Sequence, residues 1–265
     1  MQLLAVAPSM LNGKKWRRFN NYSFAAKDPV INIVGAEVGK ASLAMPLAFI
    51  VSEFQYTLVA VLSPVNNENA FISPQGSWLG NYVPATFRSY PFRLYQAEDM
   101  KAPALCIEAD SNLLVDQGDD TAADALEFFD ENGKPAAELQ KVIDFLTQIE
   151  RNRIATQKVV DLVAQLDLLE PWDYQPLVDD TIQKVNGLYR INEKKLNDLS
   201  SAEFQHLRDE AALPIIYAQL ISTNHITVFD HLFRLRKKVS SSQVKPLDIG
   251  QIEELFSDND DTLKF

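Results

Sequence analysis

The stretch that decides the fold is LAFIVSEFQYTLVAVLS, which covers residues 47–63. Apolar residues occupy positions of both parities between Tyr56 and Leu62, so this segment is apolar on both of its faces. A strand with two apolar faces is typical of the centre of a sheet. The polar step at residues 53–55, Glu-Phe-Gln, is where we expect the stretch to break into two strands.

The segments around this stretch also have strand character. Residues 29–34, 87–95 and 104–114 are further strand candidates, and Pro91 moves the second of them toward a sheet edge. Residues 116–124 predict an acidic loop, and the Asn-Gly step at 132–133 predicts a tight turn. Farther along the chain, residues 187–191 predict one more short strand.

Helical periodicity dominates after Pro135. Apolar spacing predicts one helix over residues 139–149 and a second over 159–169, which Pro171 ends. Ser200 with Glu203 forms a capping-box pair that opens another helix. The C-terminal predictions are a helix over 215–222, a last long helix capped by Asn224, a linker at 240–243, a short docking helix at 248–256 and a frayed acidic tail at 257–265.

These patterns predict an α+β fold. A β-rich N-terminal part, residues 1–134, packs against a mainly helical C-terminal part, residues 135–256, and a flexible acidic tail follows at residues 257–265. The length of 265 residues fits one large domain or two small ones.

Composition narrows the possible partners and the compartment. Hydrophobic residues make up 46% of the chain and charged residues 23%, values that are ordinary for a folded globular protein. The net charge of −11 disfavours nucleic acids and anionic membrane surfaces as partners. The single cysteine, Cys106, cannot form an intramolecular disulfide, and no segment has the roughly 20 apolar residues of a membrane helix. The apolar N-terminal residues precede the basic ones, the reverse of a secretory signal, so we expect a cytoplasmic protein with no membrane insertion.

Known catalytic motifs do not occur in the sequence. The three histidines lack metal-ligand spacing, and there is no Gly-x-Ser-x-Gly elbow and no phosphate-binding glycine loop. We therefore expect no metal, no cofactor and no catalytic residue that the sequence can identify, and non-enzymatic function is favoured. Paired carboxylates stay open, since the 36 acidic residues allow many spatial pairs.

The most unusual stretch is residues 76–93, GSWLGNYVPATFRSYPFR, in which aromatic rings and arginines alternate with glycine and proline. Amphipathic aromatics combined with arginine are typical of interaction hot spots and of sites for planar ligands. Residues 16–22 repeat the mixture on a smaller scale and could pack beside it or form a solvated basic turn. The alternative for the longer stretch is that its rings fill the core while its arginines pair with acids. The candidate binding residues are Trp78, Tyr82, Arg88, Tyr90, Arg93, Trp16 and Arg17.

These two stretches resemble the SapC family of bacterial proteins, and the likeness runs through most of the chain. The motifs that carry it mark the family rather than a reaction. They are Trp16-Arg17 with residues 22–25, then residues 45–49, 76–92, 105–108 with Ser111, 129–133, and Gly187-Leu188 with Leu196.

What the resemblance implies is a context rather than a mechanism, because no catalytic residues are established for the family. Its name comes from a surface-layer protein, and many members are encoded beside tryptophan-halogenase-like proteins and TonB-dependent receptors. This context implies a non-enzymatic accessory or binding protein of an uptake or substrate-modification system. Its partner would be a protein such as a halogenase-like protein, or a small-molecule, glycan or peptide ligand. The alternatives are an enzyme whose carboxylate site forms only in three dimensions, and a structural protein of a surface layer.

Overall fold

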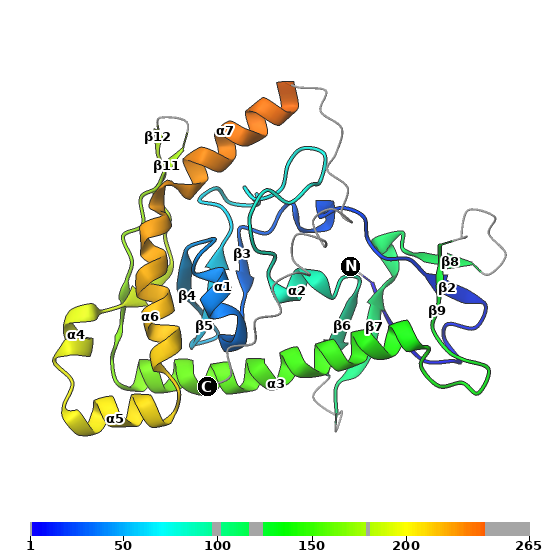
Figure 1. The fold of residues 1–265 in the computed structure, drawn as a ribbon, viewed down its shortest axis with the longest axis horizontal. Coiled ribbons are helices and arrows are strands. Elements are labelled where there is room, and N and C mark those ends of the chain that lie inside the picture. Colours follow the sequence, from blue (N-terminus) through cyan, green and yellow to red (C-terminus); the bar gives the residue numbers. More distant parts are fainter. Residues whose placement is uncertain (1, 97–101, 117–123, 179–180, 242–265) are drawn as a thin grey trace.

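The computed structural model describes residues 2–96, 102–116, 124–178 and 181–241. It has the predicted α+β architecture, in which sheets are built mainly from the first half of the chain and helices from the second (Figure 1). The predicted docking helix at 248–256 and the tail at 257–265 lie outside the described residues, as does most of the loop at 116–124. The linker predicted at 240–243 is wrong for residues 240 and 241, which end the last described helix, and its other two residues lie outside the described ranges. Within the described ranges, no helix is long and apolar enough to cross a membrane.

A five-stranded sheet forms around the stretch at 47–63, as predicted. The stretch breaks at Glu53 and Phe54, whose φ angles of 50° and 66° make the tight turn of a hairpin. All neighbouring strands in this sheet are antiparallel. In sheet order they are β10 (Leu169–Pro171), β13 (Leu188–Ile191), β4 (Leu47–Ser52), β5 (Gln55–Val61) and β3 (Val30–Asn32).

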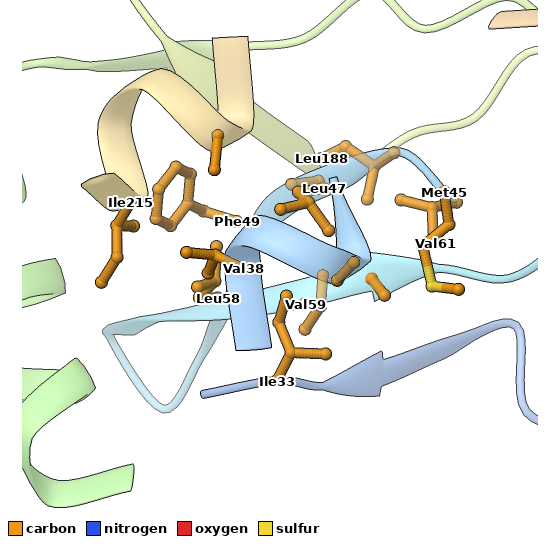
Figure 2. Close-up of a cluster of buried hydrophobic side chains, with 14 of the residues drawn as sticks. Ile33, Val38, Met45, Leu47, Phe49, Leu58, Val59, Val61, Leu188 and Ile215 are labelled. Atoms are coloured by element: carbon orange, nitrogen blue, oxygen red, sulfur yellow. The ribbon is translucent and has the colours of Figure 1, made fainter. Parts of the chain in front are cut away.

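The larger hydrophobic cluster lies around this sheet. Helix α6 (Leu213–Ser222) covers β4 and β13, and the short helix α1 (Val38–Ala41) packs against α6. Figure 2 shows side chains of the cluster converging from strands and helices that are far apart in sequence, which explains why the central strands are apolar on both faces. The side chains labelled there are Ile33, Val38, Met45, Leu47, Phe49, Leu58, Val59, Val61, Leu188 and Ile215.

A second, smaller cluster lies at the other end of the molecule (Figure 1). Here two three-stranded sheets pack near the first turns of α3 (Ala137–Gln165). The strand order is β1 (Leu3–Ala5), β7 (Ala104–Glu108), β6 (Phe92–Tyr95) in one sheet, and β8 (Leu114–Asp116), β2 (Lys14–Trp16), β9 (Leu126–Glu127) in the other.

Helix α3 joins the two clusters. Its first half contributes Leu139 and Leu146 to the smaller cluster, and its second half contributes Val160 and Val163 to the larger one. The prediction of two helices was therefore wrong, because one helix of 29 residues runs under both clusters (Figure 1). Each cluster draws side chains from both sides of residue 134, and the division into two parts stays a prediction.

Some boundaries also differ from the sequence predictions. Residues 87–88 belong to the short helix α2 (Ala85–Arg88) rather than to a strand, and β6 begins only at Phe92. Pro171 does not end a helix but lies in β10, since α3 ends earlier and the chain turns at Asp167, whose φ is 52°. Asn224 caps no helix, because it lies inside a 3₁₀ turn that precedes α7 (Val228–Ser241).

The remaining short elements follow the sequence patterns more closely. Ser200 and Glu203 form the predicted capping box at the start of α5 (Ser201–Asp209). Gly133, with φ of 74°, forms the predicted turn between Asp130 and Lys134. The other elements are α4 (Glu193–Asn197) and the hairpin of β11 (Leu177–Val178) with β12 (Thr181–Ile182).

Candidate functional site

Trp78 lies in the larger hydrophobic cluster. Its side chain is only 7% exposed and stacks on Phe71 with ring centroids 5.3 Å apart. Tyr22 and Phe87 contact other sides of the indole at 5.6 and 5.9 Å. The indole Nε1 donates a hydrogen bond of 2.9 Å to the carbonyl of Tyr82. These contacts make Trp78 a core residue that fixes the loop around it.

Two glycines of the same motif make this packing possible. A Cβ at Gly80 would lie 2.8 Å from Phe71 Cδ1 and 3.0 Å from Trp78 Nε1, too close for a side chain. Gly76 has a φ of +85°, and a Cβ there would lie 2.5 Å from Ser23 Oγ. Gly80 therefore lets the backbone lie close to two aromatic rings, and Gly76 lets the chain turn with a positive φ.

Trp16 lies in the other hydrophobic cluster. It is 3% exposed and meets Phe92 edge-on at 4.9 Å. Its neighbour Arg17 pairs with Asp124, with Nε and Oδ1 3.1 Å apart. The two aromatic stretches nevertheless pack beside each other, which is one of the two alternatives that the sequence left open. The ring centroids of Phe19 and Tyr90 lie 6.0 Å apart. The tryptophans of the two stretches, however, belong to separate cores.

Tyr82 is held by a buried carboxylate that sequence reasoning missed. The Tyr82 hydroxyl donates to Glu37 Oε2 at 2.7 Å, and the backbone N–H of Ala85 donates to the same oxygen at 2.8 Å. The N–H of Val34 donates to Oε1 at 2.9 Å. Burial, and then the neighbouring Glu37, raise the pKa of Tyr82 above its ordinary value. These three hydrogen bonds to Glu37, from Val34, Tyr82 and Ala85, are called the Glu37 clasp below. They connect residues 76–93 to the start of α1.

Arg88 lies on the surface above this clasp. Its guanidinium lies 5.9 Å from the centroid of the Tyr82 ring and 5.4 Å from that of Phe145 in α3. A long contact of 3.4 Å joins Arg88 Nη2 to the Tyr82 hydroxyl. Arg88 thus links α2 to α3 and keeps its charge in contact with solvent.

A groove of about 670 Å³ opens beside α2. It is bounded by β3 and β5 on one side and by β6 on the other, and α3 contributes Glu150, Arg153 and Gln157. The elements that line it, β3, β5, β6 and α3, can be located in Figure 1. Of the candidate residues, Tyr90 and Arg93 line this groove. Apolar and polar side chains both reach it, as in sites that bind organic ligands.

Tyr90 forms part of an aromatic wall of the groove. Its ring stacks on Phe24 with centroids 3.7 Å apart and an interplanar angle of 4°. No hydrogen bond joins its hydroxyl to another of the described residues. Burial, and then the nearby Glu108 carboxylate, raise the pKa of Tyr90. The ring is thus fixed by stacking while its hydroxyl keeps its hydrogen-bonding capacity.

Asp28 and Glu108 both lie near Arg93, which forms its ion pair with Glu108. Arg93 Nε lies 2.6 Å from Glu108 Oε1, and Glu108 is 8% exposed. Asp28 is half-buried, and in the described part of the chain its carboxylate has neither a hydrogen bond nor an ion pair. Burial raises the pKa of Asp28, the charge of Arg93 opposes that rise, and Glu108 adds to it. Arg93 thus balances only one of the two carboxylates.

The charges of the groove do not cancel. Arg153 binds Glu150 through two hydrogen bonds of 2.7 and 2.8 Å, which forms a neutral pair and lowers the pKa of Glu150. Arg93 neutralises Glu108. Among the described residues that line the groove, Asp28 therefore carries the unmatched negative charge. A cationic group is the ligand chemistry that this arrangement favours.

A first prediction concerns Asp28 and stability. Because burial raises its pKa, the folded protein binds a proton there more readily than the unfolded chain. The contribution of Asp28 to the free energy of unfolding is therefore largest below the ordinary pKa of 3.8. It falls as the pH rises through the higher pKa that Asp28 has in the folded protein. We expect Asp28→Asn to raise the free energy of unfolding at pH 7 by less than about 1 kcal/mol, since solvent screens a half-exposed charge.

Urea denaturation at pH 7 and at pH 4 measures this effect. The gain from Asp28→Asn should shrink at the lower pH, and Asp198→Asn, at an exposed position just after α4, should change little at either. A variant that is less stable than the wild type at pH 7 would show that the Asp28 carboxylate holds the fold together.

Other chemistry-bearing residues have structural surroundings. Cys106 is buried, and burial raises the pKa of its thiol, which is typical of a structural rather than a reactive cysteine. His225 Nε2 lies 2.8 Å from the carbonyl of Ser42. Over the ranges that the structure covers, no group of three His, Cys, Asp or Glu side chains could hold a metal ion.

Sequence reasoning missed Asp28, Glu37 and Glu108. They are separated by up to 80 positions, and a single sequence does not reveal which acids meet in space. Their only local signal is an acid at the boundary of an apolar segment: Asp28 precedes the strand at 29–34, and Glu108 interrupts the one at 104–114. The candidate residues Tyr90 and Arg93 adjoin the groove because they flank the start of β6.

Comparisons with known proteins identify a family. The family model described as SapC matches residues 11–228. No match was found among curated proteins or among solved structures.

Proposed function

The chain belongs to the SapC family, and from that premise we propose that it is a non-enzymatic binding protein whose ligand occupies the groove between β3 and β6. The single observation that carries the proposal is the unmatched, half-buried carboxylate of Asp28 in a groove of about 670 Å³. An uncompensated charge that is partly removed from water costs stability, and a bound cationic group would offset that cost.

The binding residues of this proposal are Tyr90, Arg93, Asp28 and Glu108. Tyr90 supplies a fixed aromatic face with a hydroxyl at its edge. Arg93 supplies an accessible guanidinium, and the buried Glu108 holds it in place through their ion pair. Trp16 and Trp78 support this site from the two cores rather than contact the ligand. Tyr82, Arg88 and Arg17 lie outside the groove lining.

In the cell, the proposed role is that of an accessory protein in an uptake or substrate-modification system. The resemblance to proteins encoded beside halogenase-like proteins and TonB-dependent receptors motivates this part of the proposal. The protein would hold a substrate in the groove, and an enzyme or receptor would act on it or deliver it.

Photocrosslinking in cells tests the binding role. A benzophenone amino acid is placed at Thr86, which is exposed and lines the groove, or at Lys40, which is exposed on α1. We expect a molecule that crosslinks from position 86 and not from position 40, and that is lost when Asp28→Asn is added. If no species is specific to position 86, the groove is not a binding site. Recovery of a halogenase-like protein or a receptor component would identify the system.

A second candidate is an enzyme that uses Asp28 and Glu108. Two carboxylates in one groove, one with a raised pKa and one paired with arginine, resemble the unequal pairs of acid–base catalysts. The crosslinked ligand separates the two functions. Chemical turnover of that ligand by the purified wild type, lost in Asp28→Asn, would establish the enzyme, whereas unchanged ligand after long incubation supports binding alone.

A further inference from the structure

Strand β6 presents an open backbone edge to the groove. Among the strands that the structure describes, it pairs with β7 alone, where the register joins Arg93 to Cys106. The N–H of Glu108 donates to the carbonyl of Pro91, so residues 91, 93 and 95 are those whose backbone groups point toward β7. The N–H and C=O of Leu94 therefore point away from β7, on the side of the groove that Leu94 lines.

Strand β3 is the corresponding edge of the five-stranded sheet. The N–H of Ile33 donates to Leu58, so residues 29, 31 and 33 pair with β5. The backbone groups of Val30 and Asn32 point outward. The only partner among the described residues is Thr86 Oγ1, which donates to the carbonyl of Asn32 at 3.2 Å. The groove is therefore lined by two strands, β3 and β6, each of which is the edge strand of its sheet.

An open edge of this kind is a template for another strand. Main-chain hydrogen bonds provide affinity when an extended peptide adds to it, and alternate side chains provide specificity. Successive side chains of such a peptide would point to opposite faces. One face would meet the aliphatic side chains of Leu146 and Ile149 from α3, and the other would be open to solvent.

Charge selects among peptides. Asp28 lies two residues before β3 and interacts electrostatically with Arg93 of β6 and with Glu108 at the end of β7, so the unmatched carboxylate lies near both strands that line the groove. The other charged side chains of the lining are already paired, Arg153 with Glu150 and Arg93 with Glu108. A lysine or arginine side chain of the peptide would supply the positive charge that pairs with Asp28.

We propose that the groove binds an extended peptide segment that adds as a strand to the open edge of β6 and places a lysine or arginine side chain against Asp28. This rests on the proposed function, since it names the class of ligand that the groove takes. A glycan would use hydroxyls and ring faces instead and would make no use of the Leu94 backbone.

Selection from a displayed library of linear peptides tests the proposal even while the natural ligand is unidentified. The full chain is the bait, and two variants serve as matched baits. Asp28→Asn changes the groove, whereas Asp198→Asn changes an exposed position outside it. We expect peptides with a basic residue at one fixed position, enriched by the wild type and by Asp198→Asn but not by Asp28→Asn. Failure to enrich any peptide that depends on Asp28 would overturn the proposal.

N-methylation of the best selected peptide then tests strand addition. Two forms of the peptide are made, one methylated at the amides of odd-numbered residues and one at those of even-numbered residues. Only one of the two forms loses the N–H donors that face β6. Calorimetric titration should give at least a tenfold loss of affinity for one form and little change for the other. Equal affinities for both methylated forms would contradict strand addition, even if the peptide binds.

A protein variant provides the reciprocal test. Leu94→Pro removes one outward N–H and no hydrogen bond to β7, and an edge strand tolerates proline at such a position. We expect at least a tenfold weaker peptide affinity, with a circular dichroism spectrum like that of the wild type. The N-methyl experiment stands independently if this variant does not fold.

The outcomes separate this inference from the proposed function. A species that crosslinks from Thr86 in cells but is not a peptide would leave the groove as a binding site and refute the peptide. A selected peptide that binds with equal affinity to Thr86→Trp, which adds a bulky ring at the groove lining, would refute both.

Discussion

Replacing Trp78 with alanine is expected to lower the free energy of unfolding by about 3–5 kcal/mol, as for other large buried aromatics. The indole is 7% exposed, stacks on Phe71, and is surrounded by Tyr22 and Phe87. Its removal leaves a cavity that these rings cannot fill without moving the glycine loop at Gly80. Urea denaturation followed by circular dichroism measures the loss.

A matched control uses an aromatic side chain that is 45% exposed, Tyr217 of α6. We expect Tyr217→Ala to cost less than about 1 kcal/mol, because much of the ring already contacts water and alanine favours the helix. If Trp78→Ala kept the stability of the wild type and lost only ligand capture, Trp78 would be a binding residue and the core assignment would be wrong.

Replacing Glu37 with leucine is expected to cost at least about 3 kcal/mol. The carboxylate is buried and accepts hydrogen bonds from two backbone N–H groups and from the Tyr82 hydroxyl. Leucine fills a similar volume but leaves three donors without an acceptor, at about 1–3 kcal/mol for each one that stays dry. The same denaturation experiment measures this loss.

Tyr82→Phe separates the parts of the clasp. It removes the bond from the Tyr82 hydroxyl to Glu37 and the long contact from Arg88 to that hydroxyl, and it should cost about 0.5–1.5 kcal/mol. In the double variant Glu37→Leu and Tyr82→Phe, the total cost should be smaller than the sum of the single costs, because the two side chains share one interaction. Additive costs would mean that Glu37 and Tyr82 act independently.

The central hairpin could be predicted because its sequence and its environment agree. Residues 47–63 are apolar on both faces since β4 and β5 lie between other strands and are covered by α6 and α3. The polar step at Glu53 and Phe54 coincides with the tight turn. The strand at 187–191 and the capping box at Ser200 are equally local signals, and the structure confirms both.

The single helix α3 could not be predicted because its apolar stripe is interrupted. Between Leu146 and Val159 the helix carries Glu150, Arg153 and Gln157, which line the groove instead of packing in a core. Periodicity alone therefore indicated two helices separated by a polar segment. The interruption marks the place where the helix passes from one hydrophobic cluster to the other.

The candidate site was predicted only in part, for a similar reason. A sequence shows that residues 76–93 are rich in rings and arginines, but not which rings face inward. Trp78 and Trp16 fill two cores, whereas Tyr90 and Arg93 adjoin the groove. The acids that complete the site, Asp28 and Glu108, come from distant parts of the sequence and line the same groove only in the folded chain.

Site-resolved amide hydrogen exchange at β6 tests most directly whether the groove offers an open edge to a ligand. In the free protein, the Leu94 amide should exchange quickly and that of Arg93 slowly, since only Arg93 points toward β7. Saturation with the selected peptide should slow exchange at Leu94 and leave Arg93 nearly unchanged. Equal protection of the two amides in the free protein, or no change at Leu94 on saturation, would contradict the open edge and the ligand assigned to it.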